Sequence, residues 1–557
     1  MTAEQAPGLA MELMGVPDVD VAGPVPIILF QKMCALHDSG QLIEAKSLCL
    51  EILKKYPEHV ETINRFGTIV GQLGDLKLAI QVFRQAIVLD PSRVVSTYNR
   101  GIAFYNLGNF DAALLHFNRV IELAPTFNSV HFSRGNVLRD LGQLAEAKAS
   151  FEQAIKLRSN DVESLVNLGN VLRDLGKFEE ALSYYSSAIS IREDCAEAYQ
   201  CRGAVFLDLQ QIPAALDSLD RAIARKPDYA QAHCNRAYAW LLAGDFERGW
   251  AEYEWRRKDP ASPLCRDARS FSRPLWLGEK SITNCSVLLH SEQGLGDTLQ
   301  FCRYVKKIAE RGARIILEVP QPLLTLLGNL EGVSHVIERG EPSPEYDYHC
   351  SLMSLPHALK IHIATIPSGV PYIRADVNRS RDWSDLLGDR KKFRVGIAWA
   401  GCIRSHIPEM VAINARRNIP LAHLVPLMHP KIEFHSLQKG QPAESELKAL
   451  TALPWSRPEL RDHSNNLNDF SDTAALIEQL DLVISVDTSV AHLAGAMCKP
   501  IWLLNRYDTC WRWMTERTDS PWYPTMKIYR QPKPGDWDSV VAAVARDLLS
   551  IAPDWSA

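Results

Sequence analysis

The chain has 557 residues, 46% of them hydrophobic and 23% charged, with a formal net charge of −5 at pH 7. A single hydrophobic core stops growing well short of this length, so we expect about three domains. The weakly acidic balance shows no basic domain, which argues against nucleic acid as the main partner.

The N-terminal segment and the cysteines indicate the compartment. Residues 1–25 carry acids and prolines but no basic stretch followed by an apolar one, and no apolar run is long enough to cross a bilayer. We therefore expect a disordered N-terminal tail over residues 1–25 and a cytoplasmic protein without a membrane span. Twelve cysteines are scattered, the nearest pair being Cys195 and Cys201, so neither a CxxC motif nor a disulfide framework is indicated.

A 34-residue period runs through the first half of the chain. Small residues recur at this spacing at Gly67, Gly101, Gly135, Gly169, Gly203 and Ala237. A second series of small residues, from Ala45 to Ala215, is followed four residues later by large side chains such as Phe83 and Tyr185. Small residues let two antiparallel helices approach, the large side chain fills the gap, and prolines such as Pro57 stop the second helix. The pattern is that of tetratricopeptide repeats, and we expect an all-α superhelix of about seven repeats over residues 26–258.

Two positions before the small residue, the first helix of three repeats carries an asparagine, at Asn99, Asn167 and Asn235. An asparagine can hydrogen-bond the backbone of an extended peptide without reading its side chains. Such a ladder is similar to the one in the repeat array of the eukaryotic O-GlcNAc transferase, which favours a groove for an acceptor peptide. Simple solvation of the groove is the alternative.

The period ends after Lys258, and the proline-bearing residues 259–280 are expected to form a linker. Beyond them, short apolar runs typical of buried strands alternate with helical patterns. The expected strands are 287–290, 314–319, 335–338, 346–352, 393–400, 433–438, 481–487 and 500–504, and the expected helices are 296–311, 321–327, 472–480 and 489–497. The alternation predicts an α/β region of two Rossmann-like halves, residues 281–385 and 386–557, with a ligand cleft between them. This is the outline of a GT-B glycosyltransferase, although alternation alone fits many nucleotide-binding proteins.

Two motifs follow expected strands: GLGDTLQF at residues 294–301 and VDTSVAHLAG at residues 486–495. The first resembles the GxGD opening of the ADP-heptose heptosyltransferase family, and the second resembles the late donor-site motif D-T-x-x-x-H of that family. Stretches at 399–401, 436–440, 519–525 and 535–537 resemble a bacterial branch in which tetratricopeptide arrays are fused to such a domain. This resemblance covers nearly the whole chain after residue 25. It implies a GT-B fold, and the branch includes enzymes that glycosylate flagellin, with the array holding the acceptor protein.

An inverting sugar transfer needs a base that takes the proton of the acceptor hydroxyl. Asp297 lies where a strand gives way to a helix, and the resemblance places an acceptor-side acid in this loop. We therefore favour Asp297 as the catalytic base, with helix capping as the alternative. Gly294 and Gly296 permit close approach of the backbone to a ligand, but the Gly-Lys-Ser/Thr ending of a phosphate-binding loop is absent.

The donor is expected on the second half. The amides of Thr488 and Ser489 would point at a diphosphate or a sugar hydroxyl, and Asp487 would accept from sugar hydroxyls. His492 belongs to the same motif, and a capped helix with a packed histidine is the alternative. The cations expected to neutralise the leaving group are Lys439, Arg416 and Arg417, and the resemblance adds Trp399 to the donor site.

One segment departs from the resemblance. Between Trp399 and Ile419 related sequences read closer to W-A-G-N-P-x-H-x-N-D-x-x-R-S, whereas this chain has Cys402, Ile403, Pro408 and Asn418 in that neighbourhood. Either the donor differs or this segment is less committed to chemistry.

Two further motifs have simpler explanations. Trp511 and Trp513 could stack on a base or a sugar, but packing is favoured. Asp536 and Asp538 match a D-x-D string at the start of the last expected helix, where capping is favoured over a manganese site. No His and Glu cluster has zinc spacing, so neither a metal nor another cofactor is expected.

The leading hypothesis is a soluble inverting glycosyltransferase that transfers a sugar from a nucleotide-sugar donor to serine or threonine of a protein acceptor, such as flagellin, held by the array. The second is a non-catalytic repeat adaptor with a degenerate transferase domain. The third is a transferase that acts on a lipid-linked or polysaccharide acceptor. The nucleotide, the sugar, the acceptor and the oligomeric state stay open.

Overall fold

The computed structural model describes residues 25–260, 262–266, 269–401, 408–451 and 460–551. Apart from Val25, the predicted disordered tail lies outside these residues. The chain forms two compact units, residues 1–201 and 202–557, and each is considered by itself. No helix within the described residues has both the length and the apolar character needed to cross a membrane.

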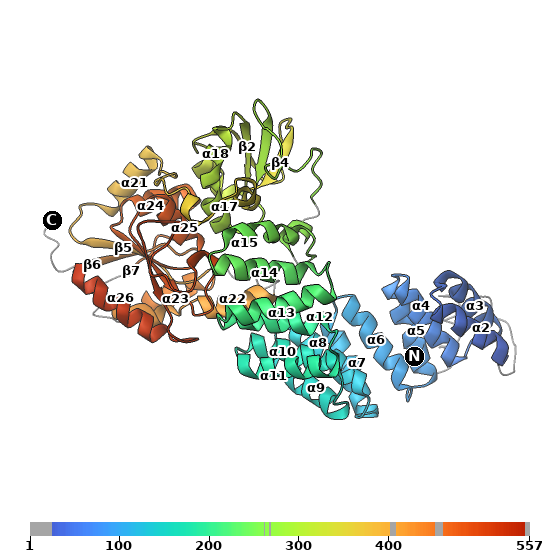
Figure 1. Ribbon diagram of the computed structural model, residues 1–557. Coiled ribbons are helices and arrows are strands. Elements are labelled where there is room, and N and C mark those ends of the chain that lie inside the picture. The colour runs from blue at the N-terminus through green and yellow to red at the C-terminus, as the bar shows by residue number, and fades with distance from the viewer. Residues whose placement is uncertain (1–24, 261, 267–268, 402–407, 452–459, 552–557) are drawn as a thin grey trace. The chain divides into compact units, whose positions relative to one another are not determined.

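Helices α2 to α15 follow one another along the first half of the chain (Figure 1). They are α2 Ile27–Asp38, α3 Leu42–Lys55, α4 Val60–Gln72, α5 Leu76–Leu89, α6 Val94–Asn106, α7 Phe110–Leu123, α8 Asn128–Asp140, α9 Leu144–Leu157, α10 Val162–Asp174, α11 Phe178–Ile191, α12 Ala196–Asp208, α13 Ile212–Arg225, α14 Ala230–Leu242 and α15 Phe246–Tyr253. Taken in pairs they correspond to seven helical hairpins, which agrees with the seven repeats expected from the 34-residue period.

The periodic glycines let the two helices of a hairpin touch. A Cβ atom placed on Gly67 in α4 would lie 2.6 Å from Cε1 of Phe83 in α5, and Gly101, Gly135 and Gly169 meet Phe117, Phe151 and Tyr185 in the same way. These aromatic side chains are buried. The ring therefore occupies the space that a side chain would need, which is why this position is glycine in the repeats.

The turn inside each hairpin ends the first helix with a residue in the left-handed region. Gly74, for example, has a φ of 92°, and glycine holds the equivalent place in most repeats. In the sixth repeat this place is taken by Gln210, with a φ of 59°. The side-chain amide of Gln210 donates a hydrogen bond to the carbonyl of Tyr507 in the α/β region. The residue with the less favourable backbone conformation is therefore also one that contacts the α/β region.

The first α/β half has a four-stranded parallel sheet of order β3-β2-β1-β4. Its strands are β1 Ser286–His290, β2 Arg314–Val319, β3 Val333–Glu338 and β4 Tyr348–Ser351, and its helices are α17 Leu295–Phe301, η3 Cys302–Tyr304, α18 Val305–Ala309, η4 Gln321–Leu323, α19 Leu324–Leu327, η5 Leu352–Ser354, α20 Leu355–Ala358 and η6 Ile363–Thr365. The register places His290 beside Glu318 and beside Ser351, so these three side chains mark one edge of the sheet.

The second half has a six-stranded parallel sheet of order β10-β9-β8-β5-β6-β7. Its strands are β5 Phe393–Ala398, β6 Ile432–Ser436, β7 Leu460–Arg461, β8 Leu482–Val486, β9 Ile501–Asn505 and β10 Met526–Arg530, and its helices are α21 Val377–Leu387, α22 Pro408–Arg417, η7 Leu421–Leu427, α23 Ala443–Thr451, α24 Phe470–Glu478, α25 Ser489–Ala496, η8 Trp511–Trp513 and α26 Trp537–Ile551. From β5, the strands β6 and β7 lie to one side and β8, β9 and β10 to the other, which is the strand order of a doubly wound sheet. The four-stranded sheet has the same order over its four strands, with β2 and β3 to one side of β1 and β4 to the other.

Two predicted boundaries need correction. The expected linker at residues 259–280 contains the short helix α16 Pro263–Arg266, and Leu275 pairs with His349 at the edge of the first sheet. Trp276, in the same segment, is buried. The expected boundary at residue 385 also fails, because Arg379 in α21 forms ion pairs with Asp469 and Asp472 next to and within α24. By its packing, α21 therefore belongs to the second half.

The main core of residues 202–557 brings three parts together. It includes Trp250 of α15, Phe301 of α17, and Trp511 and Trp522 from the segment after β9. Trp250 lies edge-on to Trp511 at 5.1 Å and to Phe301 at 6.0 Å between ring centroids. Aromatic burial on this scale, about 1.5–3 kcal/mol for a side chain, ties the last repeat hairpin to both sheets.

Two glycines of α4 provide a matched test of the repeat packing. A Cβ at Gly67 would overlap Phe83, whereas a Cβ at Gly71 would lie 3.5 Å from Cβ of Ala79, which is ordinary contact. We expect Gly67→Ala to lower the free energy of unfolding by about 1–3 kcal/mol through overpacking. Gly71→Ala should raise it by about 0.5–1 kcal/mol, because alanine is the better helix former.

The two halves of the chain can be followed separately in this experiment. All thirteen tryptophans lie at residue 240 or beyond, so a transition seen by far-ultraviolet circular dichroism but not by tryptophan fluorescence reports on residues 1–201. Equal effects of the two substitutions would contradict the proposed role of the ring.

Candidate functional site

The carboxyl edges of the two sheets carry the polar residues of the α/β region. In a doubly wound sheet, ligands bind at the carboxyl edge where the strand order reverses. These points lie between β1 and β4 in the first sheet and between β5 and β8 in the second. The loop after β1 contains Gly294 and leads into α17, whose first turn carries Asp297, and the loop after β8 contains Asp487 and Thr488.

Asp297 lies in the first turn of α17, and both of its carboxylate oxygens are engaged. Oδ2 accepts a hydrogen bond from the amide of Gly294 at 2.9 Å, so the side chain closes its own loop as a capping residue does. Oδ1 forms an ion pair with Nη2 of Arg512, in η8 of the second half. The side chain of Asp297 remains 20% exposed, so a ligand can still reach it.

Arg512 links the two motifs electrostatically. Its Nε donates to Oε1 of Gln300 at 2.6 Å, beside the ion pair with Asp297. Burial alone would lower the pKa of Arg512, but Cys510 and the carboxylates of Asp297 and Asp487 outweigh it and raise this pKa above its ordinary value. Arg512 is therefore a permanent positive charge that both aspartates share.

The glycine-rich loop and the late motif are in direct contact. A Cβ on Gly296 would lie 2.8 Å from Cδ2 of His492 and 3.4 Å from Cα of Ser489, both in α25. Gly296 is thus required for the close approach of α17 to α25. The two motifs, almost 200 residues apart in the sequence, are therefore packed against each other.

His492 has the packing role that the sequence left as an alternative. Nδ1 and the Tyr523 hydroxyl are hydrogen-bonded at 2.9 Å, and the ring stacks on Trp513. Burial, and to a lesser degree the charges of Arg512 and Arg303, lower the pKa of His492 to about 3, although Asp487 opposes the shift. The imidazole is therefore neutral at pH 7 and holds α25 against the tail of the second half.

Arginines gather at the carboxyl edge of the second sheet. Arg417 donates from Nη1 to the carbonyl of Asp487 at 3.0 Å, and Arg416 pairs with Asp508 at 2.9 Å. Arg506, which follows β9, also pairs with Asp508 at 3.0 Å and is buried. Nε of Arg506 has no hydrogen-bond partner among the described residues. Together with Arg512, these side chains suit a multiply charged anion at the N-terminus of α25.

Two expected donor-site residues have other roles. Lys439 donates from Nζ to the carbonyl of Ser464 at 2.9 Å and to that of Leu467, so it ties its own loop to the segment after β7. Trp399 is fully buried, and its indole N–H donates to Glu446 at 2.8 Å. Both side chains therefore have structural partners, and their assignment to the donor site stays a prediction.

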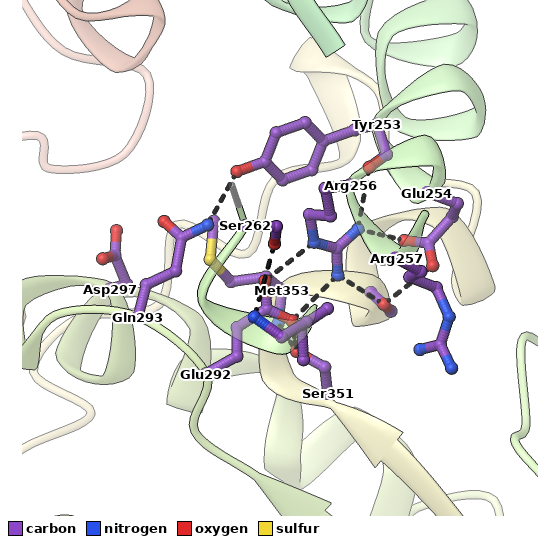
Figure 2. A network of polar contacts seen from close by, with 12 residues as sticks. Tyr253, Glu254, Arg256, Arg257, Ser262, Glu292, Gln293, Asp297, Ser351 and Met353 are labelled. Carbon is purple, nitrogen blue, oxygen red and sulfur yellow. Dashed lines mark hydrogen bonds and ion pairs between the residues drawn. The ribbon is translucent and has the colours of Figure 1, made fainter. Parts of the chain in front are cut away.

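A buried ion-pair network joins the last repeat hairpin to the first sheet (Figure 2). Arg256 lies in η2 Glu254–Arg257, which continues α15. Its guanidinium donates to the two oxygens of Glu292 at 2.7 and 3.0 Å, and to Ser354 at 2.7 Å. Glu292 also accepts from the Ser351 hydroxyl, and Glu254 contacts the opposite side of the guanidinium.

Tyr253 extends this contact to the candidate catalytic loop. It occupies the place of the aromatic residue in the seventh repeat, 34 residues after Leu219. Its hydroxyl accepts a hydrogen bond from the side-chain Nε2 of Gln293, the residue before Gly294, at 3.0 Å (Figure 2). The last repeat therefore helps to position the loop that carries Asp297.

The asparagines of the repeat helices differ in their contacts. Asn167 is engaged, because Oδ1 accepts from Arg139 at 2.6 Å and Nδ2 donates to the carbonyl of Glu163. Asn99 and Asn235 are half-buried, and their side chains make no hydrogen bond within the described residues. Ser133, at the equivalent position, bonds to Tyr98 of the preceding repeat. The asparagine position of the first helix therefore joins adjacent repeats at Ser133 and at Asn167, a role that was not predicted from the sequence.

The remaining candidate motifs are structural. Trp511 and Trp513 are buried, as the packing interpretation expects. Asp536 accepts hydrogen bonds from the amide and hydroxyl of Ser539 and so caps α26. Among the described residues, no three His, Cys, Asp or Glu side chains are arranged to hold a metal ion. In the divergent segment, residues 402–407 lie outside the described residues, while Asn418 accepts from the amide of Gly401 at 2.9 Å.

Sequence reasoning missed four charged residues of the site: Arg256, Glu292, Arg506 and Arg512. Two of them lie next to features that the sequence shows. Arg512 lies between Trp511 and Trp513, and Glu292 follows the first strand at the same end as Asp297. Arg256 and Arg506 have no local motif.

The Arg256–Glu292 pair should dominate the stability of residues 202–557. Both side chains are almost completely buried, with 3% and 1% of their surface exposed. Removing one partner of such a pair costs about 3–5 kcal/mol. We expect Glu292→Gln to lower the free energy of unfolding by this amount in urea denaturation followed by tryptophan fluorescence. Glu254 pairs with the same arginine but is more exposed, so Glu254→Gln should lower the free energy of unfolding by clearly less. An equal loss in both variants would contradict the dominance of Glu292.

The neutral state of His492 predicts a pH dependence. An unfolded histidine binds a proton near pH 6.5, whereas in the folded protein burial lowers this pKa to about 3. As the pH falls below about 6.5, the unfolded state gains a proton that the folded state lacks. The free energy of unfolding should therefore fall, by at most about 1.4 kcal/mol per pH unit from this group.

This slope can be isolated by substitution. Between pH 7 and pH 5, His492→Asn should reduce the fall in the free energy of unfolding, whereas the control His335→Asn, at an exposed position of β3, should leave it unchanged. Identical slopes for the wild type and His492→Asn would refute the assignment.

Comparisons with known proteins identify the first half of the chain. Tetratricopeptide-repeat models match residues 60–93, 96–127, 126–194 and 202–263. Protein FlbA from Caulobacter vibrioides is 28% identical over 344 residues, which are 57% of this chain and 54% of FlbA. The chain thus spans about half the length of this curated relative.

Solved structures of tetratricopeptide repeat proteins are also similar to this chain. A tetratricopeptide repeat protein from Parabacteroides merdae is 18% identical, with 41% of this chain and 90% of that chain covered and a TM-score of 0.36. YrrB, described as a tetratricopeptide protein with an unusual peptide-binding site, is 23% identical, with 33% and 95% covered and a TM-score of 0.29. The matches to the repeat models show that the chain carries tetratricopeptide repeats, which suggest a role in protein interaction.

Proposed function

We propose that the chain is an inverting GT-B glycosyltransferase that transfers a sugar from a nucleotide-sugar donor to serine or threonine of a protein. The observation that carries the proposal is the contact between the loop of Asp297 and the N-terminal end of α25 at the carboxyl edges of two doubly wound sheets. Each edge alone suits many ligands. Their meeting, with a carboxylate on one side and arginines on the other, suits transfer between two bound substrates.

The donor side is supported by charge and geometry. The N-terminus of α25 offers amide groups, and Arg506, Arg512 and Arg417 lie at the same edge. A nucleoside phosphate would satisfy the buried Nε of Arg506 and offset its charge. In this proposal arginines, rather than Lys439 or a metal ion, neutralise the phosphate that leaves.

The chemical step uses Asp297 as the base. The acceptor oxygen attacks the anomeric carbon, the bond from this carbon to the phosphate oxygen breaks, and the hydroxyl proton passes to the carboxylate of Asp297. Oδ2 is held by the amide of Gly294, while Oδ1 is paired with Arg512. The donor phosphate would draw Arg512 from Oδ1, which frees this oxygen for the hydroxyl. Donor binding would thereby activate the base.

The acceptor is proposed to be a protein because the tetratricopeptide repeats suggest protein partners and because the last repeat contacts the Asp297 loop through Tyr253. Flagellin is the candidate that the sequence resemblance implies. Asn99 and Asn235 retain amides for the backbone of such an acceptor, whereas Asn167 would have to give up Arg139.

A non-catalytic adaptor is the second candidate. It is favoured by the structural roles of Lys439 and Trp399 and by the occupied carboxylate of Asp297. The two candidates differ in whether the second sheet binds a nucleotide.

Thermal unfolding with ADP, UDP, GDP and CMP in turn tests the donor site. A ligand at 100 times its Kd stabilises the folded state by about 2.7 kcal/mol, so one nucleotide should selectively raise the Tm reported by tryptophan fluorescence. Arg506→Lys should abolish this shift. Arg394→Lys, a buried arginine at the amino end of β5, is the matched control and should retain it. No shift with any nucleotide would favour the adaptor.

The base is tested with the donor that the nucleotide screen selects. Water can replace the acceptor, so slow hydrolysis of the nucleotide-sugar is a usable signal. Asp297→Asn should lower this rate by about 100- to 10,000-fold, the contribution of a general base, while the nucleotide-induced Tm shift is retained. An unchanged rate would remove Asp297 from the mechanism.

A further inference from the structure

A small cavity lies at the carboxyl edge of the first sheet. Its volume is about 180 Å³, and the residues that line it include Arg257, Arg269, Phe271, His290, Ser291 and Arg339. Small-molecule sites are commonly about 300–1,000 Å³, so a nucleotide-sugar does not fit.

Ser291 gives the cavity an unsatisfied hydroxyl. The residue is 2% exposed, and Oγ has no hydrogen-bond partner among the described residues. The backbone amide of Ser291 is satisfied, since it donates to the carbonyl of Glu318 at 3.1 Å. Burial of a hydroxyl without a partner is unfavourable, so a bound acceptor atom would stabilise this arrangement.

Arg257 contributes a positive charge to the cavity, and two nearby carboxylates of the described residues are paired with other arginines. Glu318 is paired with Arg269, and Glu292 is paired with Arg256. The guanidinium of Arg257 makes no hydrogen bond or ion pair within the described part of the chain, and it lies outside the Arg256 network (Figure 2).

Two histidines experience this positive charge: His290 lines the cavity, and His349 lies next to it on β4. His290 and His349 stack on Phe271 with ring centroids 4.5 and 4.0 Å away, and their ring nitrogens are 3.3 Å apart. Burial, followed by the charges of Arg257 and Arg269, lowers the pKa of His349 to about 4. Burial also lowers the pKa of His290 well below its usual range, with His349, Arg269 and Arg257 adding to the effect. Both rings are neutral at pH 7, so arginine supplies the positive charge.

We propose that this cavity binds a small oxyanion, a phosphate or a carboxylate, between the Arg257 guanidinium and the Ser291 hydroxyl. The site is separate from the proposed donor site at α25 and goes beyond the proposed transfer reaction. The anion is either a free ion or the end of an acidic side chain on a protein partner. In the second case the cavity helps to select which segment of the partner lies beside the catalytic loop.

The first experiment is isothermal titration of the full chain with inorganic phosphate and, separately, with acetate, at constant ionic strength. Arg257→Gln should weaken the binding at least tenfold, and Ser291→Ala should weaken it measurably. The matched control is Lys258→Gln, which removes the same charge at the adjacent exposed position. Saturable binding that is lost in Arg257→Gln and kept in Lys258→Gln supports the site.

The source of the anion is separated by a second titration. The capped peptides acetyl-Gly-Glu-Gly-amide and acetyl-Gly-Gln-Gly-amide differ only in the charge of one side chain. Stronger binding of the glutamate peptide, competing with phosphate or acetate, indicates an acidic side chain. Binding of phosphate or acetate with no preference between the peptides indicates a free ion.

Two results would overturn the proposal. One is the absence of saturable binding by every probe, and the other is equal affinity in the wild type and Arg257→Gln. Each variant is first checked for an unchanged Tm without ligand. If a nucleotide still raises the Tm of Arg257→Gln, the donor site is intact in this variant, and a loss of anion binding is independent of the proposed donor site.

Discussion

The buried ion pair between Arg256 and Glu292 is the constraint on which the functional arrangement depends. Glu292 follows β1 at the point where the order of the first sheet reverses, and Arg256 follows the last repeat helix. A guanidinium with 3% exposure loses most of its hydration, so it must keep both carboxylates that surround it. The end of the repeat hairpin is thereby fixed in position and orientation. Tyr253, three residues earlier, then accepts a hydrogen bond from the side-chain amide of Gln293, in the loop that leads to Asp297.

The meeting of the two sheets depends on a different constraint, which is the absence of a side chain at Gly296. His492 occupies the space that a Cβ would need, and Tyr523 and Trp513 prevent the imidazole from moving aside. This close approach allows Arg512 to reach Asp297 from the second half. Packing and electrostatics are coupled here: without the glycine, the distance between the two aspartates would increase and no single arginine could serve both.

The sequence predicts the parts of this structure that rest on local repetition. Gly67 and Phe83 recur every 34 residues because one hairpin geometry is used again, and β1, β5 and β8 are apolar runs because both faces of a parallel strand are buried. The site is less predictable. Lys439 and Trp399 suit a donor site by residue type, but their partners come from backbone carbonyls and from Glu446. Arg512 and Asp297 are 215 residues apart, and no local pattern indicates their contact.

The same physical logic explains why the two sheet edges suit different ligands. The edge at α25 combines helix amides with several arginines and is accessible through the partly exposed Asp297 and Asp487, so it suits a large, multiply charged group. The edge at β1 is lined by Phe271 and the neutral His290, and the carboxylates of Glu292 and Glu318 already have arginine partners. Among the described residues, this leaves the Arg257 guanidinium and the Ser291 hydroxyl, a pair that matches a single small anion. Residues 292–297 connect the two places, so an anion held beside Ser291 would act directly on the loop that positions Asp297.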